Sequence, residues 1–472
     1  MTGADGTRAE LLAAGVAILA ESLAEVSVDA LTVRAVTRHA GRSIGSFYHY
    51  WPDRRSYRRD LLEFFTEPGS SSCEDPLLGL LDGCVPDAVV VLDAFWHHVV
   101  HVADDESFRR RILLLALDDR EASAAAGRMY ARSGQTMALV VCRILEAADR
   151  EPIDGVDLDD LALCLTAFVE GFAIRLLVGD GAATPHLVAT AITALLLSLS
   201  RPVGEERSFA DFAGELAGRF APPADPLDDA VLGSRTAGGP QDSRDEPEVG
   251  VTVDAPAPPS ARRDDRTRTE LLEVGAQLLT SLAAAPSLRS VTVSAVTRRT
   301  GCSTGAFYHY WETQADFAQE LVALVADPGV VDDDPMMDDF EDLGPSDASW
   351  ADIVDLVELR IDHVAEAEDF GLQWSLLLTS DRAVRSGLGL VYQRYQERTT
   401  LTVRGVLDAI GARLLHGLES RDLALMFDTM IDGFGVCRRG QPEAVNRLRI
   451  EALLGSIVAF TFTAGDSASP SR

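Results

Sequence analysis

The chain repeats itself, and this internal repeat constrains the possible fold more than any other feature of the sequence. Residues Thr7–Phe65 align without a gap with Thr267–Val325 at a constant offset of 260 (267 − 7), and about 24 of the 59 aligned positions are identical. Further along, Asp160–Leu163 recurs as Asp422–Leu425 at an offset of 262 (422 − 160). Chance similarity would not keep one register over such a length. The sequence therefore predicts a duplicated unit of about 200 residues.

The segment between the two copies has a different composition. Residues 222–261 are rich in Pro, Gly, Asp and Ala, and their apolar residues show no helical period. Such a composition is typical of a solvated, flexible chain. We expect a disordered acidic Pro/Gly linker here, long enough to let the second copy fold back beside the first.

The overall composition is that of a globular protein, with 47% hydrophobic and 25% charged residues. A net charge of -32 argues against a protein that coats nucleic acid nonspecifically, but not against a specific DNA reader with local positive charge. The 6 cysteines form no CxxC pair, so we expect reduced and mostly buried thiols. No apolar run is long enough for a membrane span and the N-terminus does not resemble a secretion signal, so we expect a cytoplasmic protein without a membrane partner.

Each copy begins with a pattern of short helices. Thr32 is a good N-cap for a helix over Val33–His39, Gly41 follows that helix, and Ser43 caps a second short helix over Ile44–Tyr50. A further helix is expected to begin after Asp53 and to run to about Phe65. The second copy repeats these signals at Thr292, Gly301, Ser303 and Thr313. Two short helices joined by a Gly-containing turn predict a helix-turn-helix, whose second helix enters the DNA major groove.

The string AGRSIGSFYHYWPDRRSY in the first copy, and its counterpart in the second, resemble the TetR/AcrR family pattern AG-V-S-x-G-[ST]-[FL]-Y-x-[HY]-F. The resemblance covers about 50 residues of each copy. It implies an all-α fold of two tandem TetR-like units related by a pseudo-two-fold axis, and a single-chain pseudo-dimer. Each unit would hold a helix-turn-helix domain and a helical ligand-binding and dimerisation domain. The implied domains are 1–65 and 66–221 in the first unit, then 262–325 and 326–465 in the second. Tandem members of the family and this composition suggest an actinobacterial source.

The resemblance and the helix pattern together give the candidate DNA-contacting residues. Tyr, His, Ser and Arg side chains in these positions can donate hydrogen bonds to phosphates or reach base edges. The sequence departs from the family at Arg42 and Cys302, where a small apolar residue is usual, and at Trp51 and Trp311, where Phe is usual. The candidates are Thr32, Arg34, Arg42, Ser43, Ile44, Ser46, Tyr48, His49, Tyr50, Arg54 and Arg55 in the first copy, and Thr292, Ser303, Thr304, Ala306, Tyr308, His309 and Tyr310 in the second.

The two predicted helix-turn-helix regions, called the first and second reader from here on, differ in charge. Between Thr32 and Asp60 the first copy has seven arginines against two acids, about +5, whereas Thr292–Glu320 has two arginines against three acids, about -1. We therefore predict that the first copy supplies most phosphate contacts and that the operator is an imperfect palindrome. The same charge difference supports the alternative of a protein-interaction module whose helix-turn-helix domains no longer bind DNA.

The helical remainder of each copy is expected to hold the dimer interface and an effector site. The nearly all-apolar helices at 158–178 and 185–200, with their counterparts at 421–437 and 443–460, are too apolar to be exposed, and the family places a four-helix interface there. By the same resemblance, a small hydrophobic effector would bind between the middle helices and release a repressor from DNA. The candidate effector-binding residues are Phe95, Trp96, His97, Phe108, Met129, Tyr130, His363, Phe370, Trp374, Tyr392 and Tyr395.

Enzyme, cofactor and metal functions have little support in the sequence. No phosphate-binding glycine loop, nucleophile elbow or HExxH motif is present. His97 and His101 have the spacing of two metal ligands on one helix face, but no third ligand has a clear placement. We therefore expect no enzyme, no cofactor and no metal site, and a chain whose partners are an operator in double-stranded DNA and a small-molecule effector. Further homodimerisation of the pseudo-dimer stays open.

Overall fold

The structure is a computed structural model that describes residues 3–21, 31–66, 77, 79, 87–116, 120–179, 181–220, 259–280, 291–326, 349–367, 374, 376–377 and 382–463. The described part of the chain is mostly helical, as the sequence predicts, and its four strands are only two or three residues long. The expected linker at 222–261 falls largely outside these residues. Helix α11 begins at Pro259, three residues before the expected domain boundary, because proline is well tolerated in the first turn of a helix.

Four helices make each of the two helix-turn-helix regions. The first region contains α1 (Gly3–Glu21), α2 (Val33–His39), α3 (Ile44–Tyr50) and α4 (Arg54–Thr66). The second region contains α11 (Pro259–Thr280), α12 (Val293–Thr300), α13 (Thr304–Tyr310) and α14 (Gln314–Ala326). The bounds of α3 and α13, and those of α4 and α14, differ by 260 positions (304 − 44 and 314 − 54). The helices thus recur with the same spacing as the sequence repeat.

The remaining elements form two helical bodies that follow the same order. The first has α5 (Ala88–Asp104), α6 (Glu106–Ala116), α7 (Arg120–Ala147), β1 (Arg150–Pro152), α8 (Leu158–Val178), α9 (Pro185–Ser198), β2 (Ser200–Pro202) and α10 (Phe209–Arg219). The second has α16 (Trp350–Glu366), α18 (Arg382–Ala409), β3 (Arg413–Leu414), α19 (Ser420–Gly440), α20 (Arg447–Thr461) and β4 (Phe462–Thr463). In each body the two short strands pair antiparallel, β1 with β2 and β3 with β4. Four pairs of helices begin 262 positions apart, namely α5 with α16, α7 with α18, α8 with α19, and α9 with α20.

Local sequence signals explain where the central helices begin and end. Asp157 and Asp160 form a reciprocal capping box at the start of α8, and Gly179 ends that helix with a left-handed φ of 77°. Thr184 caps α9, which has Pro185 in its first turn. Helix α8 is long and apolar enough to cross a membrane, but 94% of its apolar window is buried inside the fold. Its composition is therefore explained by its position at the centre of the protein.

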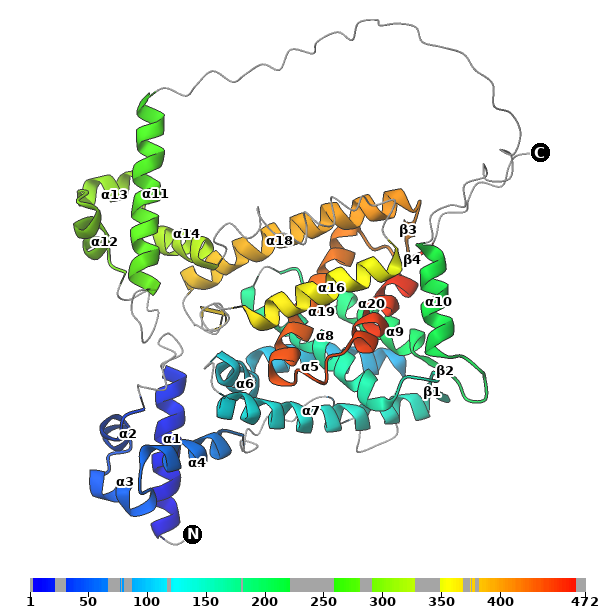
Figure 1. Cartoon of the computed structure of the whole chain (residues 1–472), viewed down its shortest axis with the longest axis horizontal. Helices are drawn as coiled ribbons and strands as arrows, with labels where there is room; N and C mark the ends of the chain where they lie inside the picture. Colours follow the sequence, from blue (N-terminus) through cyan, green and yellow to red (C-terminus); the bar gives the residue numbers. More distant parts are fainter. Residues whose placement is uncertain are drawn as a thin grey trace, which may run out of the picture.

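Helices α8, α9, α19 and α20 form the centre of the molecule (Figure 1). Helix α8 packs on α19, and α9 packs on α20. Both of these contacts join the first half of the chain to the second. The backbones of α8 and α19 nearly touch at two glycines. A Cβ at Gly171 would lie 1.9 Å from the carbonyl oxygen of Thr429, and a Cβ at Gly433 would lie 1.9 Å from that of Ala167. Only glycine leaves room for such an approach.

Helix α10 is a second link between the two halves. Phe212 and Leu216 of α10 are buried against α20, where a Cβ at Gly455 would lie 2.5 Å from Leu216. Just beyond α10, the Phe220 ring lies 5.5 Å from the ring of Trp350. The end of the first half of the chain therefore covers part of the second half.

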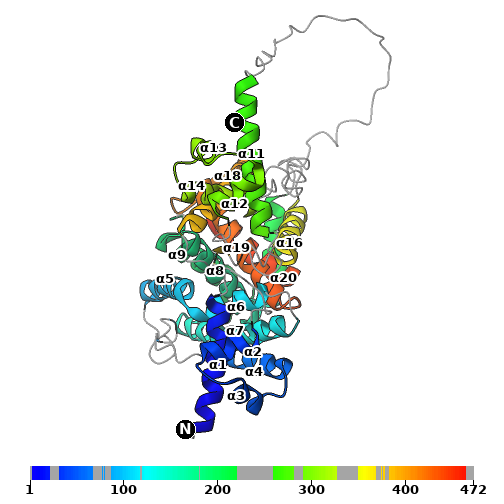
Figure 2. The ribbon, with the colours of Figure 1, turned by 90° about the vertical axis from the view of Figure 1, so that its left-hand side faces the viewer.

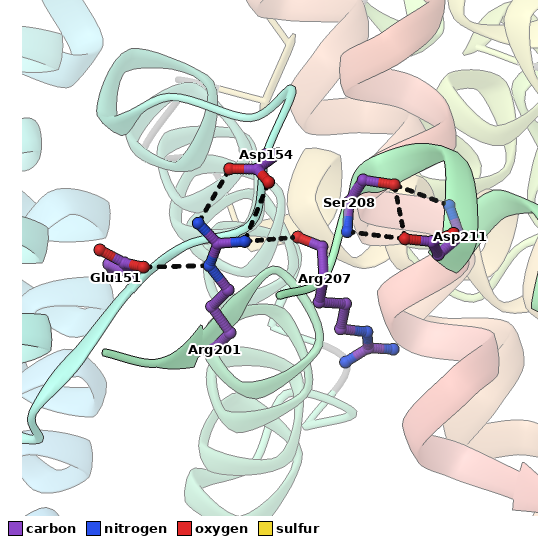
Figure 3. A network of polar contacts seen from close by, with 6 residues as sticks. All are labelled: Glu151, Asp154, Arg201, Arg207, Ser208 and Asp211. Carbon is purple, nitrogen blue, oxygen red and sulfur yellow. Dashed lines mark hydrogen bonds and ion pairs between the residues drawn. The ribbon is translucent and has the colours of Figure 1, made fainter. Parts of the chain in front are cut away.

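A network of polar contacts fixes the chain where it enters α10 (Figure 3). The Arg201 guanidinium donates two hydrogen bonds to Asp154, of 2.8 and 3.0 Å, and one of 3.1 Å to Glu151. It also donates to the carbonyl oxygen of Arg207. Ser208 and Asp211 then form a capping box, and the hydrogen bonds from Ser208 lower the pKa of the Asp211 carboxyl. The antiparallel pair of β1 and β2 thereby sets the direction of α10.

Candidate DNA-binding site

Side-chain caps shape the helix-turn-helix of the first region. The Thr32 hydroxyl accepts a hydrogen bond from the amide of Ala35 at 3.1 Å, and the Ser43 hydroxyl accepts one from the amide of Ser46 at the same distance. Between the two helices, Gly41 takes a left-handed φ of 62°, which favours glycine. Thr292, Ser303 and Gly301 do the same in the second region, where the φ of Gly301 is 71°. Thr32, Ser43, Thr292 and Ser303 therefore position the reading helices.

Helix α3 has one buried and one exposed face. Phe47 is fully buried and its ring lies 4.9 Å from the ring of Tyr57. On the opposite face, Ile44 is 52% and Tyr48 is 53% exposed, and His49 is exposed as well. The exposed face of α3 therefore presents Ile44, Tyr48 and His49, and side chains of these types can contact base edges or donate hydrogen bonds to phosphates.

The sequence-predicted contact residues lie on this surface. In the first region Thr32, Arg34, Arg42, Ser43, Ile44, Tyr48, His49, Arg54 and Arg55 are exposed, and Ser46 and Tyr50 are half-buried. In the second region Thr292, Ser303, Thr304, Tyr308 and His309 are exposed, and Ala306 and Tyr310 are half-buried. In Figure 1 both regions lie on the left of the helical bodies, with α3 and α13 at that edge. Figure 2 looks at this side, with α13 at the top and α3 at the bottom.

A tryptophan and a carboxylate hold each reading helix to the first helix of its region. The Trp51 indole donates a hydrogen bond of 2.8 Å to Asp60, which also forms an ion pair of 2.6 Å with Arg8 of α1. These hydrogen bonds outweigh partial burial and lower the pKa of the Asp60 carboxyl. In the second region the Trp311 indole donates to Glu320 at 2.7 Å, and Arg268 pairs with the same carboxylate. The replacement of the usual Phe by Trp thus adds a hydrogen bond that orients the reader.

The two regions differ directly before the reading helix. Arg42 pairs with Glu10 of α1, and both side chains are about half exposed. At the equivalent positions the second region has Cys302, which is half-buried, and Glu270, which is exposed. The first reader therefore holds a guanidinium beside the N-terminus of α3, and the second has no cation at that place.

Each reader is attached to the long helix of its own body. Helix α4 packs on α7, and α14 packs more extensively on α18. A Cβ at Gly387 of α18 would lie 2.5 Å from the carbonyl oxygen of Gln319 of α14. The equivalent residue in α7 is Ala125, which is fully buried (387 − 262 = 125). The second reader is consequently held the more closely of the two.

The candidate effector-binding residues divide by burial. Phe95, Phe108, Met129, Tyr130 and Trp374 are buried, Trp96, Tyr392 and Tyr395 are half-buried, and His97 and His363 are exposed. Phe370 lies outside the described residues. The two histidines thus face away from the interior positions that the aromatic residues occupy.

Sequence reasoning missed two clusters of buried charge beside α8 and α19. Cluster one consists of Arg111, Tyr130, Glu170 and Cys437. Glu170 is only 1% exposed, pairs with Arg111 at 2.7 Å and accepts a hydrogen bond of 2.7 Å from the Tyr130 hydroxyl. Burial raises the pKa of Glu170, although Arg111 opposes that rise. The available signal was the two charges, Glu170 and Arg175, in α8 beyond its acidic first turn, where the helix is otherwise apolar.

Cluster two consists of Arg175, Arg360, Tyr392, Asp428 and Asp432. Arg175 is 1% exposed, pairs with Asp428 at 2.9 Å and stacks over the Tyr392 ring at 4.6 Å. Burial raises the pKa of Asp432 to about 6, with the Asp428 carboxylate adding to the effect. Each cluster contains one residue from the other half of the chain, Cys437 in cluster one and Arg175 in cluster two.

Comparison with known families and proteins bears on the first reader. Residues 17–56 match the family model described as bacterial regulatory proteins, tetR family. The matched segment runs from the end of α1 through α2 and α3 to the start of α4, so it covers the helix-turn-helix described above. No curated protein matches the chain. Residues 17–56 therefore match the DNA-binding domain of the tetR family of bacterial regulatory proteins, which supports a DNA-binding transcription regulator at the family level.

Proposed function

We propose that the chain is a cytoplasmic transcriptional repressor that binds an operator of two unequal half-sites as a single-chain pseudo-dimer. Two tandem TetR-like units, each with its own helix-turn-helix, would take the places of two protomers. A small hydrophobic effector bound among the helices of the bodies would release the DNA. The observation that carries this proposal is the pair of glycine contacts between α8 and α19.

These contacts are reciprocal. Gly171 and Gly433 occupy equivalent positions (433 − 171 = 262), and so do the residues that they touch, Ala167 and Thr429 (429 − 167 = 262). Each glycine meets the residue four positions before its own counterpart. In an isologous dimer interface, residue i of one protomer contacts residue j of the other and j contacts i. The same relation within one chain supports a pseudo-two-fold axis between α8 and α19.

The attachment of the readers supports a link between the bodies and DNA. Helices α4 and α14 pack on α7 and α18, which in turn pack on α8 and α19. Arg132 of α7 also donates a hydrogen bond to the carbonyl oxygen of Thr66 at the end of α4. A ligand that shifts α7 or α18 would therefore change the separation of the two readers, and a two-site operator is sensitive to that separation.

Unequal charge supports unequal half-sites. The first reader exposes Arg34, Arg42, Arg54 and Arg55, whereas Cys302 stands at the position of Arg42 in the second. Phosphate contacts supply much of the affinity for DNA and depend on such cations. We propose that the first reader binds its half-site more tightly and that the second adds affinity through its attachment to the first.

A genomic DNA selection with the full chain tests this function. Wild type, Tyr48→Ala and Tyr308→Ala are compared with Leu139→Ala, which removes an exposed apolar side chain of α7 away from both readers. We expect one enriched promoter-proximal site with wild type and Leu139→Ala, its loss with Tyr48→Ala, and weaker enrichment with Tyr308→Ala. No enrichment by wild type at low salt would contradict the proposal and favour a protein-interaction module.

A further inference from the structure

The two buried clusters occupy equivalent places but are completed differently. Glu170 and Asp432 are equivalent (432 − 170 = 262), as are Tyr130 and Tyr392 (392 − 130 = 262). Arg175 enters cluster two from the first half of the chain, and Cys437 enters cluster one from the second half. These two residues also occupy equivalent positions (437 − 175 = 262). The chain thus places one carboxylate in each body beside the helix pair that joins the two halves, with Glu170 buried and Asp432 half-buried.

Cluster one contacts both oxygens of its carboxylate from within the protein, although the contact of Arg111 with Oε1 is an ion pair without a hydrogen bond. Arg111 supplies an ion pair to one oxygen of Glu170 at 2.7 Å, and the Tyr130 hydroxyl donates to the other oxygen at 2.7 Å. The Arg111 guanidinium also lies 5.0 Å from the centre of the Tyr130 ring. A ligand would have to displace these contacts to reach Glu170, so cluster one is closed.

Cluster two does not satisfy its carboxylate in this way. Asp432 is one methylene shorter than Glu170. Arg175 forms its ion pair with Asp428. Among the described residues, the buried Oδ2 atom of Asp432 has no hydrogen-bond partner. A buried acceptor without a donor costs free energy, and a bound donor would recover it.

The charges around Asp432 indicate which kind of donor fits. Arg175 from α8 and Arg360 from α16 act on the two carboxylates of α19, Asp428 and Asp432. With both carboxylates ionised, these four charges sum to zero. A cationic ligand would leave an excess positive charge in a buried place, which is costly, whereas a neutral O–H or N–H donor keeps the balance.

We propose that cluster two is the effector-recognition point of the protein and that it binds a neutral, largely apolar molecule whose hydroxyl or amide N–H donates to Asp432. This inference rests on the proposed function and assigns the response to the second body. Because Arg175 belongs to α8 and Asp432 to α19, a ligand here would contact both halves of the chain at their interface. The ligand would thereby act on the packing that sets the separation of the readers.

Fluorine NMR titration of the full chain at pH 7.5, without DNA, tests the proposal. The probes are 4-fluorophenol, which has a neutral donor, 4-fluoroanisole, which lacks the donor, and 4-fluorobenzylamine, which is cationic. The proteins are wild type, Asp432→Leu, Asp432→Asn and Glu170→Gln, each checked for helical content first. We expect wild type to bind 4-fluorophenol at least about tenfold more tightly than the other two probes, the effect of one hydrogen bond to a charged group.

The variants locate the site. Asp432→Leu is expected to lower the affinity for 4-fluorophenol at least about tenfold, because it removes the acceptor. Asp432→Asn, a fallback should the leucine variant not fold, keeps a neutral acceptor and is expected to give a smaller loss in the same direction. Glu170→Gln is expected to bind as wild type does. The inference is overturned if wild type does not bind 4-fluorophenol, or if either other probe binds equally well. It is also overturned if the Asp432 variants bind like wild type, or if Glu170→Gln loses binding while it keeps the helical content of wild type. A failure of DNA recognition would leave all these results unchanged, so the two failures are distinguishable.

Discussion

Gly171 of α8 and Gly433 of α19 each lie against the backbone of the other helix, with no room for a methyl group at either position. The first predicted consequence is that Gly171→Ala or Gly433→Ala separates the two halves of the fold. An added Cβ would lie 1.9 Å from a carbonyl oxygen that belongs to a helix and cannot move aside. We expect each substitution to lower the free energy of unfolding by about 3 kcal/mol or more, at the upper end of overpacking effects.

The matched control for this prediction is Gly134→Ala in α7, where an added Cβ would meet nothing within 4 Å. That change should raise the free energy of unfolding by up to about 1 kcal/mol, since Ala is a better helix former than Gly. Urea unfolding followed by circular dichroism measures all three variants. Equal stability of Gly171→Ala and Gly134→Ala would mean that α8 and α19 do not approach each other as described.

The second prediction concerns pH. Burial raises the pKa of Asp432 from an ordinary value of 3.8 to about 6, so the folded chain holds this proton more tightly than the unfolded chain. The contribution of Asp432 to the free energy of unfolding therefore falls as pH rises from about 4 to 6, and above pH 6 the buried carboxylate costs up to about 3 kcal/mol. Asp432→Asn should be more stable than wild type at pH 7.5, and the advantage should shrink towards pH 4.

Thermal unfolding of wild type and Asp432→Asn between pH 4 and pH 8 measures this difference. Asp211→Asn is a control of opposite sign, because its hydrogen bonds lower the pKa of the Asp211 carboxyl. Its loss of stability should persist across this pH range and should vanish only below the ordinary pKa of 3.8, as pH falls through the lowered pKa of the Asp211 carboxyl. If the difference in thermal stability between wild type and Asp432→Asn does not change with pH, the Asp432 carboxyl does not have the raised pKa described for cluster two.

The third prediction concerns Glu170 and Arg111. These side chains form an ion pair in which both partners are almost entirely buried. Removal of one partner leaves a buried charge without compensation, which costs about 3–5 kcal/mol. We expect Arg111→Met to lower the free energy of unfolding by this amount and the double variant Arg111→Met with Glu170→Gln to recover much of it. A double variant no more stable than Arg111→Met would show that the two residues do not interact.

How far the sequence predicts this molecule depends on whether a feature is local. Thr32, Gly41 and Ser43 fix the ends of α2 and α3 through contacts within a few residues, and the predicted bounds Val33–His39 and Ile44–Tyr50 are confirmed. The predicted helix at 158–178 is likewise confirmed. Helix α20 begins at Arg447, and the expected start near Glu443 is wrong, because Asn446 caps the helix and Gln441–Val445 form turns.

Other features depend on contacts between distant residues, and pattern alone does not reveal them. The sequence shows that Gly171 and Gly433 are equivalent, but not that each touches the opposite helix. Glu170 and Arg175 have partners, Arg111 and Asp428, that lie 59 (170 − 111) and 253 (428 − 175) positions away, so no local pattern indicates these ion pairs. His97 and His363 were candidate effector-binding residues on the family resemblance, and the structure places both on exposed helix faces.

The fourth prediction concerns the unequal readers. Cys302→Arg would place a guanidinium beside Glu270, as Arg42 lies beside Glu10 in the first reader. We expect tighter operator binding and a steeper salt dependence, by about 0.9 in the slope of log K against log salt for one added phosphate contact. Cys302→Ser is the control and should leave the slope unchanged. Filter binding over a salt series measures both, and an unchanged slope with Cys302→Arg would show that this position does not reach DNA.

The measurement that tests the central claim most directly is a footprint on the selected operator combined with the mass of the complex. We expect one chain to protect two half-sites of the operator unequally, and we expect Tyr308→Ala to leave the weaker half-site unprotected. Five added base pairs between the half-sites, about half a helical turn, should also abolish joint binding, because the two readers face one side of the DNA. Two chains on the operator, or binding unchanged by the insertion, would contradict the claim that one chain holds both readers of a dimer.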